Sequence, residues 1–356
     1  MPASRKTPAA LTPVPGGAAH DIEQRKKDHI DIILSGQAKH GLAAGFDDIA
    51  FEHNALPETD FAGIDLSTRF LGKALRIPFL ASSMTGGPQL GGRINMSIAE
   101  AAQELGFAMG VGSQRIALGG GVNHGLDKSI RRVAPDIALY ANLGAVQLVH
   151  GMTVDDAKRA VDLIGADALI LHLNPLQEAL QPGGDRNWSG VSAAIARLCE
   201  ALPVPVIAKE VGAGISVPVA RRLADYGVAA IDVAGAGGSS WAAVEGRRTS
   251  SQEGRHLGEL FRDWGIPTAQ ALHDISTALP DMPIIASGGI RHGLDGAKAI
   301  RLGATLVGQA AALLPAATQG TEQVVRHVGE WSEALRIACF ATGSATLEEL
   351  GRARLR

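Results

Sequence analysis

The sequence is poor in cysteine, in net charge and in long apolar runs. Its two cysteines, Cys199 and Cys339, are too few for a disulfide framework and lack the spacing of a zinc site. We therefore expect a reducing compartment, the cytoplasm. The formal net charge of −3 gives no general attraction to nucleic acid or to an anionic membrane. No apolar run approaches the roughly 18 residues of a transmembrane helix.

The chain also lacks the glycine fingerprint of dinucleotide-binding proteins. Residues 109–113 contain a Gly-x-Gly pair, but the third glycine of the pattern is missing. What is present is ample material for a core, because 46% of the 356 residues are hydrophobic.

From residue 78 onward, short apolar runs alternate with amphipathic stretches. Strands are expected at 79–82, 108–111, 137–141, 168–173, 204–208, 229–233, 283–286 and 305–307. Helices are expected at 94–105, 154–164, 191–201, 217–226, 268–278, 294–302 and 321–337. Eight strands, polar residues at nearly every strand end and the missing fingerprint favour an α/β fold of the (β/α)₈ TIM barrel type. An open doubly wound sheet is the alternative.

The chain reads as one domain with additions at both ends. Residues 1–20 are rich in Pro and Ala and lack the apolar centre of a secretory signal, so we expect a disordered leader. Residues 21–77 form an N-terminal extension that begins with a helix over 21–34. The barrel is assigned to 78–315, and a C-terminal helix is expected within 316–356.

The most informative stretch is the apolar run 168–173 and the polar residues that follow it. A buried parallel strand is expected to end in His172, and Asn174, Gln177 and Glu178 follow it. Such a strand places reactive side chains at the mouth of a barrel. Glu178 is a candidate ligand for Mg²⁺. His172 and Gln177 could move a proton or could be hydrogen-bonded supports. A glycine-rich loop then leads to Ser189, a plausible helix N-cap.

Other strand ends carry anion-binding patterns. Ser287-Gly288-Gly289-Ile290-Arg291 and Gln309-Ala310-Ala311 follow the last two expected strands, where barrels often bind a phosphate through backbone N–H groups. Lys209 could pair with an anion or with an electron-rich cofactor atom. Ser113, Gln114 and Arg115 form a donor cluster suited to an anionic substrate. The basic run at residues 25–27, with His29 nearby, is by default a solvated helix face.

Taken together, these motifs resemble the type 2, flavin-dependent isopentenyl-diphosphate isomerases, from about Arg25 to near the end of the last strand. The matching stretches lie at 25–29, 84–87, 111–115, 141–144, 172–174, 177–178, 184–186, 209–212 and 287–289.

The resemblance implies a role for each matching residue. FMN would be bound by Ser83, Met84, Thr85, Gly86, Ser113, Asn142, Lys209, Ser239, Gly289, Ile290, Arg291, Ala310 and Ala311. Substrate would be bound by Arg25, Lys26, His29, Ser113, Gln114, Arg115, Asn174 and Gln177. Glu178 would bind Mg²⁺, and Gln177 and His172 would assist catalysis. Ser239 replaces a usual threonine, and Ala234 and Ala311 depart from residues common in the family.

The implied activity is the interconversion of isopentenyl and dimethylallyl diphosphate by a 1,3-proton shift in isoprenoid biosynthesis. It would use reduced FMN, NADPH as reductant and Mg²⁺, in a homo-oligomer (a tetramer or octamer). An FMN-dependent 2-hydroxy-acid oxidase or dehydrogenase is the first alternative, because such enzymes share the 288–291 motif. A flavoprotein without catalytic activity is the second.

Overall fold

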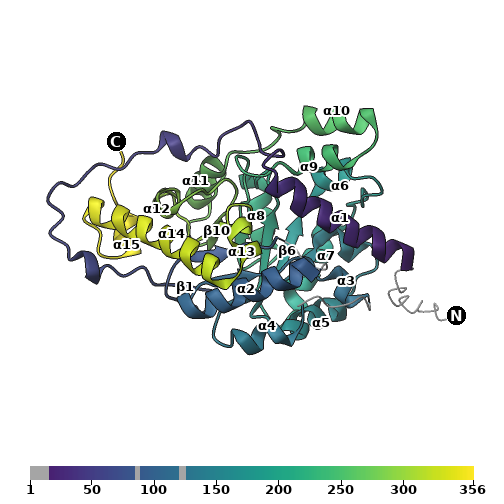
Figure 1. Cartoon of the computed structure of the whole chain (residues 1–356), viewed down its shortest axis with the longest axis horizontal. Coiled ribbons are helices and arrows are strands. Elements are labelled where there is room, and N and C mark those ends of the chain that lie inside the picture. The colour runs from purple at the N-terminus through teal and green to yellow at the C-terminus, as the bar shows by residue number, and fades with distance from the viewer. Residues whose placement is uncertain (1–15, 85–88, 120–125) are drawn as a thin grey trace.

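A computed structural model describes residues 16–84, 89–119 and 126–356. Eight parallel strands close into a barrel in the order β10-β3-β4-β5-β6-β7-β8-β9 (Figure 1). The strands are β3 (Phe79–Ala81), β4 (Ala108–Gly110), β5 (Leu139–Gly144), β6 (Ala168–Leu173), β7 (Val206–Glu210), β8 (Ala230–Asp232), β9 (Ile284–Ala286) and β10 (Leu306–Gln309). The predicted (β/α)₈ barrel is confirmed, and closure through the β10–β3 pair excludes the open sheet.

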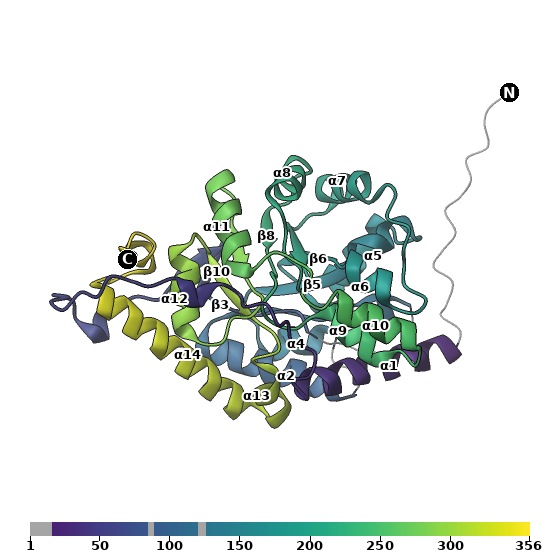
Figure 2. The same cartoon turned by 90° about the horizontal axis from the view of Figure 1, so that it is seen from above.

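Helices connect the strands on the outside of the barrel (Figure 2). They are α2 (Gln89–Leu105), α3 (Arg115–Leu118), α4 (Lys128–Val133), α5 (Val154–Ile164), α6 (Pro175–Leu180), α7 (Val191–Ala201), α8 (Val217–Asp225), α9 (Trp241–Arg248), α10 (Gln252–Leu260), α11 (Thr268–Ala278), α12 (Gly293–Arg301), α13 (Leu314–Gln319), α14 (Thr321–Thr342) and α15 (Leu347–Leu350), with the 3₁₀ turn η3 (Ala145–Val149) after β5. The expected bounds of α5, α7 and α11 coincide with those observed. Helices α6, α9 and α10 were not expected, because they are short and lie within the loops after β6 and β8.

One predicted helix cap is wrong. Helix α7 is capped by Gly190, at φ 86°, and not by Ser189. The chain enters the helix through a left-handed conformation that glycine adopts without the steric cost of a side chain.

The barrel strands are apolar over most of their length because both of their faces are buried. Side chains such as Ile170, Ile207 and Leu306 fill the barrel interior, together with alanines from alternating strands. The opposite faces pack against the surrounding helices in a second, larger core. Polar residues are therefore concentrated at the strand ends.

A hairpin that the sequence did not reveal closes the amino-terminal end of the barrel. Strands β1 (Thr68–Phe70) and β2 (Lys73–Leu75) pair antiparallel. Phe70 and Leu75 are buried in the same cluster as the barrel interior, and the Phe70 ring lies 6.2 Å from the ring of Tyr140. Lys73 Nζ reaches Asp167 Oδ1 at 2.7 Å, just before β6. The carboxyl-terminal end of the barrel is therefore the end that remains open for a functional site.

The N-terminal extension crosses the molecule and meets the C-terminus. It begins with α1 (Gly16–Leu34), which starts inside the predicted leader and packs against α9 (Figure 2). The turns η1 (Phe46–Asp48) and η2 (Phe61–Gly63) follow. At the far end Phe51 pairs with Leu355, so the middle of the extension is joined there to the C-terminal segment. Among the described residues, no helix combines the length and apolarity needed to cross a membrane.

Replacing Phe70 with Ala should cost about 3–5 kcal/mol of unfolding free energy, because it leaves a cavity between the hairpin and the barrel interior. Urea denaturation measures this loss. Leu56→Ala is the control: Leu56 is 75% exposed, so its replacement should change stability by less than about 0.5 kcal/mol. Equal effects for the two variants would contradict the role of the hairpin as a plug.

Candidate functional site

Strand register brings the polar strand ends to one level of the barrel mouth. His172 pairs with Lys209, and Lys209 with Asp232, across three adjacent strands. Lys209 Nζ lies 3.1 Å from Asp232 Oδ2, and Ser287 Oγ donates to Asp232 Oδ1 at 2.6 Å. All three side chains are buried, so the ammonium and carboxylate stabilise each other as charged groups. This triad fixes the lysine at the mouth.

His172 is held by Asn142, and Asn142 is held by Gln114. The Nδ1 atom of His172 lies 2.8 Å from Asn142 Oδ1, which assigns the ring proton to Nδ1 in the neutral form. Burial, with the charge of Lys209 nearby, lowers the pKa of His172 to about 4. The Gln114 side chain accepts from Asn142 N at 3.0 Å and donates to Ala160 O at 2.9 Å. Gln114 therefore supports Asn142 with both ends of its amide.

The loop after β9 is a glycine turn that exposes its backbone. Gly288 and Gly289 have φ values of 99° and 71°, a conformation that side-chain-bearing residues rarely adopt. A Cβ atom at Gly289 would lie 2.7 Å from the carbonyl carbon of Gly237, so no side chain fits there. Thr268 Oγ1 donates to Gly288 O at 2.6 Å and fixes the turn from behind. Such a turn leaves N–H groups available to an anion.

Features of the mouth fit a bound FMN. The hydroxyl oxygens of Ser82 and Ser83, at the end of β3, are buried and have no hydrogen-bond partner among the described residues. Lys209 and the Gly288–Gly289 turn offer a cation and backbone donors near the same strand ends. Buried polar groups without partners are rare, so the two hydroxyls point to a ligand with polar edges.

A carboxylate on α9, that of Glu245, holds the basic helix α1 at the barrel mouth. Glu245 Oε1 lies 3.0 Å from His29 Nε2 on α1 and accepts from Gln177 Nε2 on α6 at 3.0 Å. Arg248 Nη1 donates to Glu245 Oε2 at 2.7 Å. Although burial opposes ionisation, these partners lower the pKa of Glu245 to about 2. The carboxylate is therefore ionised at neutral pH and connects three helices.

Two arginines and a second carboxylate line the same region. Burial lowers the pKa of Arg25, and the charges that act on it include those of Glu245, Glu178 and Arg115. Arg115 Nη1 lies 3.3 Å from Asp185 Oδ2. Glu178 is buried; its Oε1 accepts from Asn174 Nδ2 at 3.0 Å, and its Oε2 accepts from Asp185 N at 2.8 Å. Each oxygen keeps a lone pair for a cation, although the described residues contain no cluster of three or more potential ligands.

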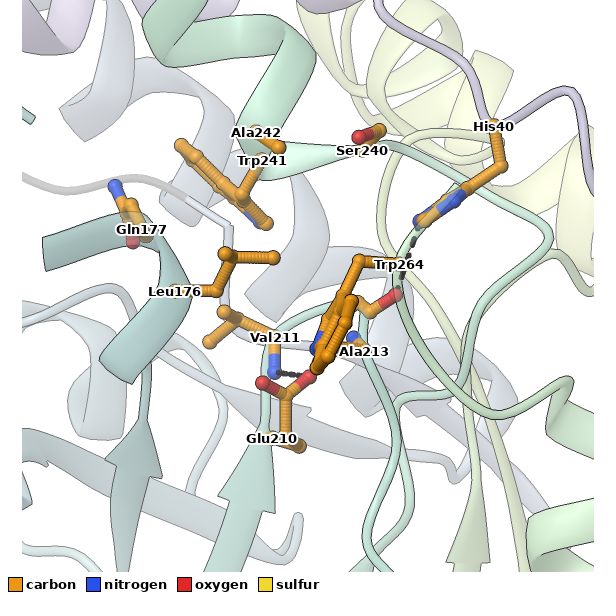
Figure 3. Close-up of a pocket in the computed structure, with 11 residues that line it drawn as sticks. His40, Leu176, Gln177, Glu210, Val211, Ala213, Ser240, Trp241, Ala242 and Trp264 are labelled. Carbon is orange, nitrogen blue, oxygen red and sulfur yellow. Dashed lines mark hydrogen bonds between the residues drawn. The ribbon is translucent and has the colours of Figure 1, made fainter. Parts of the chain in front are cut away.

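A small pocket lies between α6, α9 and the end of β7 (Figure 3). Its lining includes Gln177 and Trp241, and the Glu210 side chain lies at the end of β7. Glu210 Oε2 accepts the backbone N–H groups of Val211 and Gly212 at 2.6 Å each. Burial raises the pKa of Glu210 to about 7, against the effect of these donors. The carboxyl group thereby shapes the loop that follows Lys209.

The structure gathers most of the predicted residues at this mouth. The guanidinium of Arg291, at the end of the glycine turn, is engaged by Asp295 and Asp47. Ser239 forms an isolated bridge with Lys39, and Ile290 is buried. Met84, Ser113, Ala310 and Ala311 lie in the loops that directly follow β3, β4 and β10, whereas Thr85 and Gly86 lie outside the described residues.

Glu245 and Arg248 were not predicted as site residues. Their helix was not expected, so neither side chain could be placed at the mouth. The available signal was their spacing of three residues, which favours an ion pair on a helix.

A closed parallel barrel with a glycine turn after its seventh strand and a buried lysine at its mouth defines a flavin-type (β/α)₈ barrel. Residues 181–356 match the family model described as FMN-dependent dehydrogenase. A lactate oxidase of Pediococcus acidilactici has a similar fold, with a TM-score of 0.64, 19% identity and coverage of 95% of this chain and 93% of that one. A mandelate oxidase structure gives 0.66 at 18% identity, covering 95% and 98%.

Sequence relatives then define the family. The chain is 60% identical over 333 residues to the isopentenyl-diphosphate delta-isomerase of Xanthobacter autotrophicus, covering 93% of this chain and 97% of that protein. It is 50% identical to that of Synechocystis, covering 93% and 95%. The chain belongs to the isopentenyl-diphosphate delta-isomerases of the type 2, flavin-dependent class.

The low pKa of His172 predicts acid sensitivity. Its folded pKa of about 4 lies below the ordinary value of 6.5, so the unfolded chain binds the proton first as pH falls. Stability should decrease between these values by up to about 1.4 kcal/mol per pH unit from this group, and urea titrations at pH 7, 6 and 5 measure the slope. His172→Gln should flatten it, whereas His273→Gln, at an exposed histidine of α11, should not. Parallel slopes for the wild type and His172→Gln would refute the assignment.

Proposed function

We propose that this protein interconverts isopentenyl and dimethylallyl diphosphate with reduced FMN and Mg²⁺. The observation that carries the proposal is the bridge from His29 through Glu245 to Gln177. This bridge joins the basic helix α1 to a barrel mouth that has the donors suited to a flavin. A diphosphate and a flavin could therefore be held side by side.

On the flavin side, the chain's own groups suit each part of FMN. The Gly288–Gly289 turn and the loop at Ala310–Ala311 would hold the phosphate through backbone N–H groups. Lys209, fixed by Asp232, would lie against the electron-rich edge of the ring. Reduced FMN would supply the proton donor and acceptor for a shift without net oxidation, since ordinary side chains protonate an unactivated alkene poorly.

On the diphosphate side, Arg25, Lys26, His29 and Arg115 would bind the phosphoryl oxygens. Two cations on α1 and one on α3 offer more than a single contact, and charge-assisted bonds to phosphate are strong. Glu178 would hold Mg²⁺, which commonly takes one or two carboxylates, substrate oxygens and several waters. Asn174 orients Glu178 and is within 3.1 Å of Gln177 Oε1.

Proton movement by the chain would centre on Gln177, next to the ionised Glu245. The low pKa of Glu245 makes it a weak base, so its role would be to orient the Gln177 amide, which donates a hydrogen bond to it. The neutral His172 would orient the flavin through its unprotonated nitrogen more readily than act as a charged acid. Exclusion of water from the mouth would protect a cation-like transition state.

The remaining assignments are also proposals. NADPH would reduce the flavin, and the protein would act as a homo-oligomer, a tetramer or octamer. The free Cys199 and Cys339 suit a reducing compartment, the cytoplasm. A net charge of −3 favours a small-molecule substrate and not nucleic acid.

The alternative 2-hydroxy-acid oxidase is supported by a similar fold, by the 288–291 motif and by the match to the FMN-dependent dehydrogenase model. Such enzymes use a base histidine at a strand end, and residues 232–241 after β8 contain none. An inert flavoprotein would leave the cations of α1 without a role.

The activity is tested anaerobically with isopentenyl diphosphate, FMN and Mg²⁺, with and without NADPH or dithionite. Dimethylallyl diphosphate should form only with reduced flavin and without stoichiometric consumption of NADPH. No product from protein that holds reduced FMN would overturn the proposal. Bleaching of the flavin by lactate or glycolate would then favour the oxidase.

Glu178→Gln should raise the Mg²⁺ concentration needed for half-maximal activity by at least about tenfold, because the amide removes the charge that attracts the cation. Mg²⁺ titrations at saturating substrate measure the shift. Glu200→Gln, which makes the same change at an exposed position of α7, should leave the titration unaltered. An unchanged requirement in Glu178→Gln would remove this residue from the metal site.

A further inference from the structure

We propose that Asp47, in the N-terminal extension, is a positioning residue for the flavin phosphate. Asp47 holds Arg291, and Arg291 in turn fixes the Gly288–Gly289 turn. The inference rests on the proposed function, because that function assigns the phosphate of FMN to this turn. Arg291 then links the extension to the turn through its side chain and is not a direct ligand of the phosphate.

The contacts of Arg291 account for most of its hydrogen-bonding capacity. Its Nε and Nη2 atoms donate to the two carboxylate oxygens of Asp295, at 2.8 and 2.9 Å. Its Nη1 and Nη2 atoms donate to the two oxygens of Asp47, at 3.1 and 2.6 Å. The backbone N–H of Arg291 also donates to Asp295, at 3.0 Å. The guanidinium therefore ties η1 to the start of α12 by two bidentate pairs.

Further contacts anchor the same part of the extension. Lys298 Nζ on α12 donates to Phe46 O at 2.7 Å, and Ala269 N on α11 donates to Ala44 O at 2.9 Å. The Phe46 side chain is buried. Residues 44–47 are thus held at successive points against the two helices that flank β9.

This anchored segment forms the outer wall of the glycine turn. A Cβ atom at Gly289 would lie 2.8 Å from Ala44 Cβ, and one at Gly237 would overlap the backbone of Ala44. On the inner side, Gln309 Nε2 donates to Ile290 O and Arg291 O at 3.2 Å each. The turn is therefore clamped between β10 and the extension, so a shift of residues 44–47 would disturb the N–H groups that face the phosphate.

The direction in which FMN affinity changes when Asp47 is neutralised distinguishes a positioning role from a purely electrostatic one. Asp47 is an anion, and the Arg291 guanidinium holds its pKa below the usual value. If only the charge of Asp47 mattered, its removal would strengthen the binding of an anionic phosphate. If Arg291 were a direct ligand, releasing it from Asp47 would do the same. Positioning predicts the opposite sign.

The test compares Asp47→Asn with Asp48→Asn. Both variants remove one negative charge from the same turn, and among the described residues no side-chain bond to Asp48 was found. Dissociation constants for FMN and for riboflavin, which lacks the phosphate, are measured by quenching of flavin fluorescence at low ionic strength. Thermal unfolding confirms that each variant is folded.

Asp47→Asn should weaken FMN binding by about two- to fivefold, the size expected for a well-formed ion pair at the surface, and leave riboflavin binding unchanged. Asp48→Asn should bind FMN as tightly as the wild type or slightly more tightly. Arg291→Lys keeps the charge but loses the bidentate geometry, so it should weaken FMN binding like Asp47→Asn.

Unchanged or tighter FMN binding in Asp47→Asn would overturn the inference, as would an equal loss for riboflavin. A wild-type protein that does not bind FMN would instead overturn the proposed function, and this assignment with it. If Asp47→Asn does not fold, Asp47→Glu replaces it. This variant keeps the charge but displaces the carboxylate, so weaker binding of FMN with unchanged binding of riboflavin supports positioning, and unchanged or tighter FMN binding overturns it.

Discussion

The buried carboxylate of Glu245 is the interaction on which the rest of the site depends. An ionised carboxylate away from water is costly unless its oxygens are paired. Here His29, Gln177 and Arg248 supply the partners, and they come from three different helices. Satisfying one charge therefore requires α1 to lie on α9 beside α6. The basic residues of α1 are brought to the barrel mouth as a consequence.

The barrel imposes a second constraint, which determines where polar residues can lie. Parallel strands with both faces buried leave only their ends for polar residues, and the hairpin of β1 and β2 closes one end. Register then aligns His172, Lys209 and Asp232 at the remaining end. Under the proposed function, the barrel supplies the flavin side of the site, and the extension supplies most of the cations assigned to the diphosphate.

The sequence predicted what depends on local pattern. The bounds of β6 were predicted correctly, because an apolar run followed by polar residues marks a buried strand and its end. The barrel class was predicted from the alternation of eight strands with helices. The hairpin at 68–75 and helix α9 were missed, since their formation depends on contacts with distant parts of the chain. Gln114 illustrates the same limit: its residue type indicates a donor, but only the placement of Asn142 and Ala160 reveals that both ends of its amide are occupied.

The two halves of the site are also connected through the extension. Residues 38–40, between α1 and η1, hydrogen-bond to the loop after β8: Ser240 N donates to Ala38 O at 2.8 Å, and His40 N donates to Gly238 O at 2.9 Å. Ala44 then contacts the glycine turn after β9. The same stretch of chain thus leaves the helix that carries Arg25 and passes along the loops assigned to the flavin phosphate. Because these contacts are backbone hydrogen bonds and close packing, displacement of this segment at one end would shift the contacts at the other. Under the proposed function the extension is part of the active site, because the barrel alone would lack the cations of α1 and the outer wall of the phosphate turn.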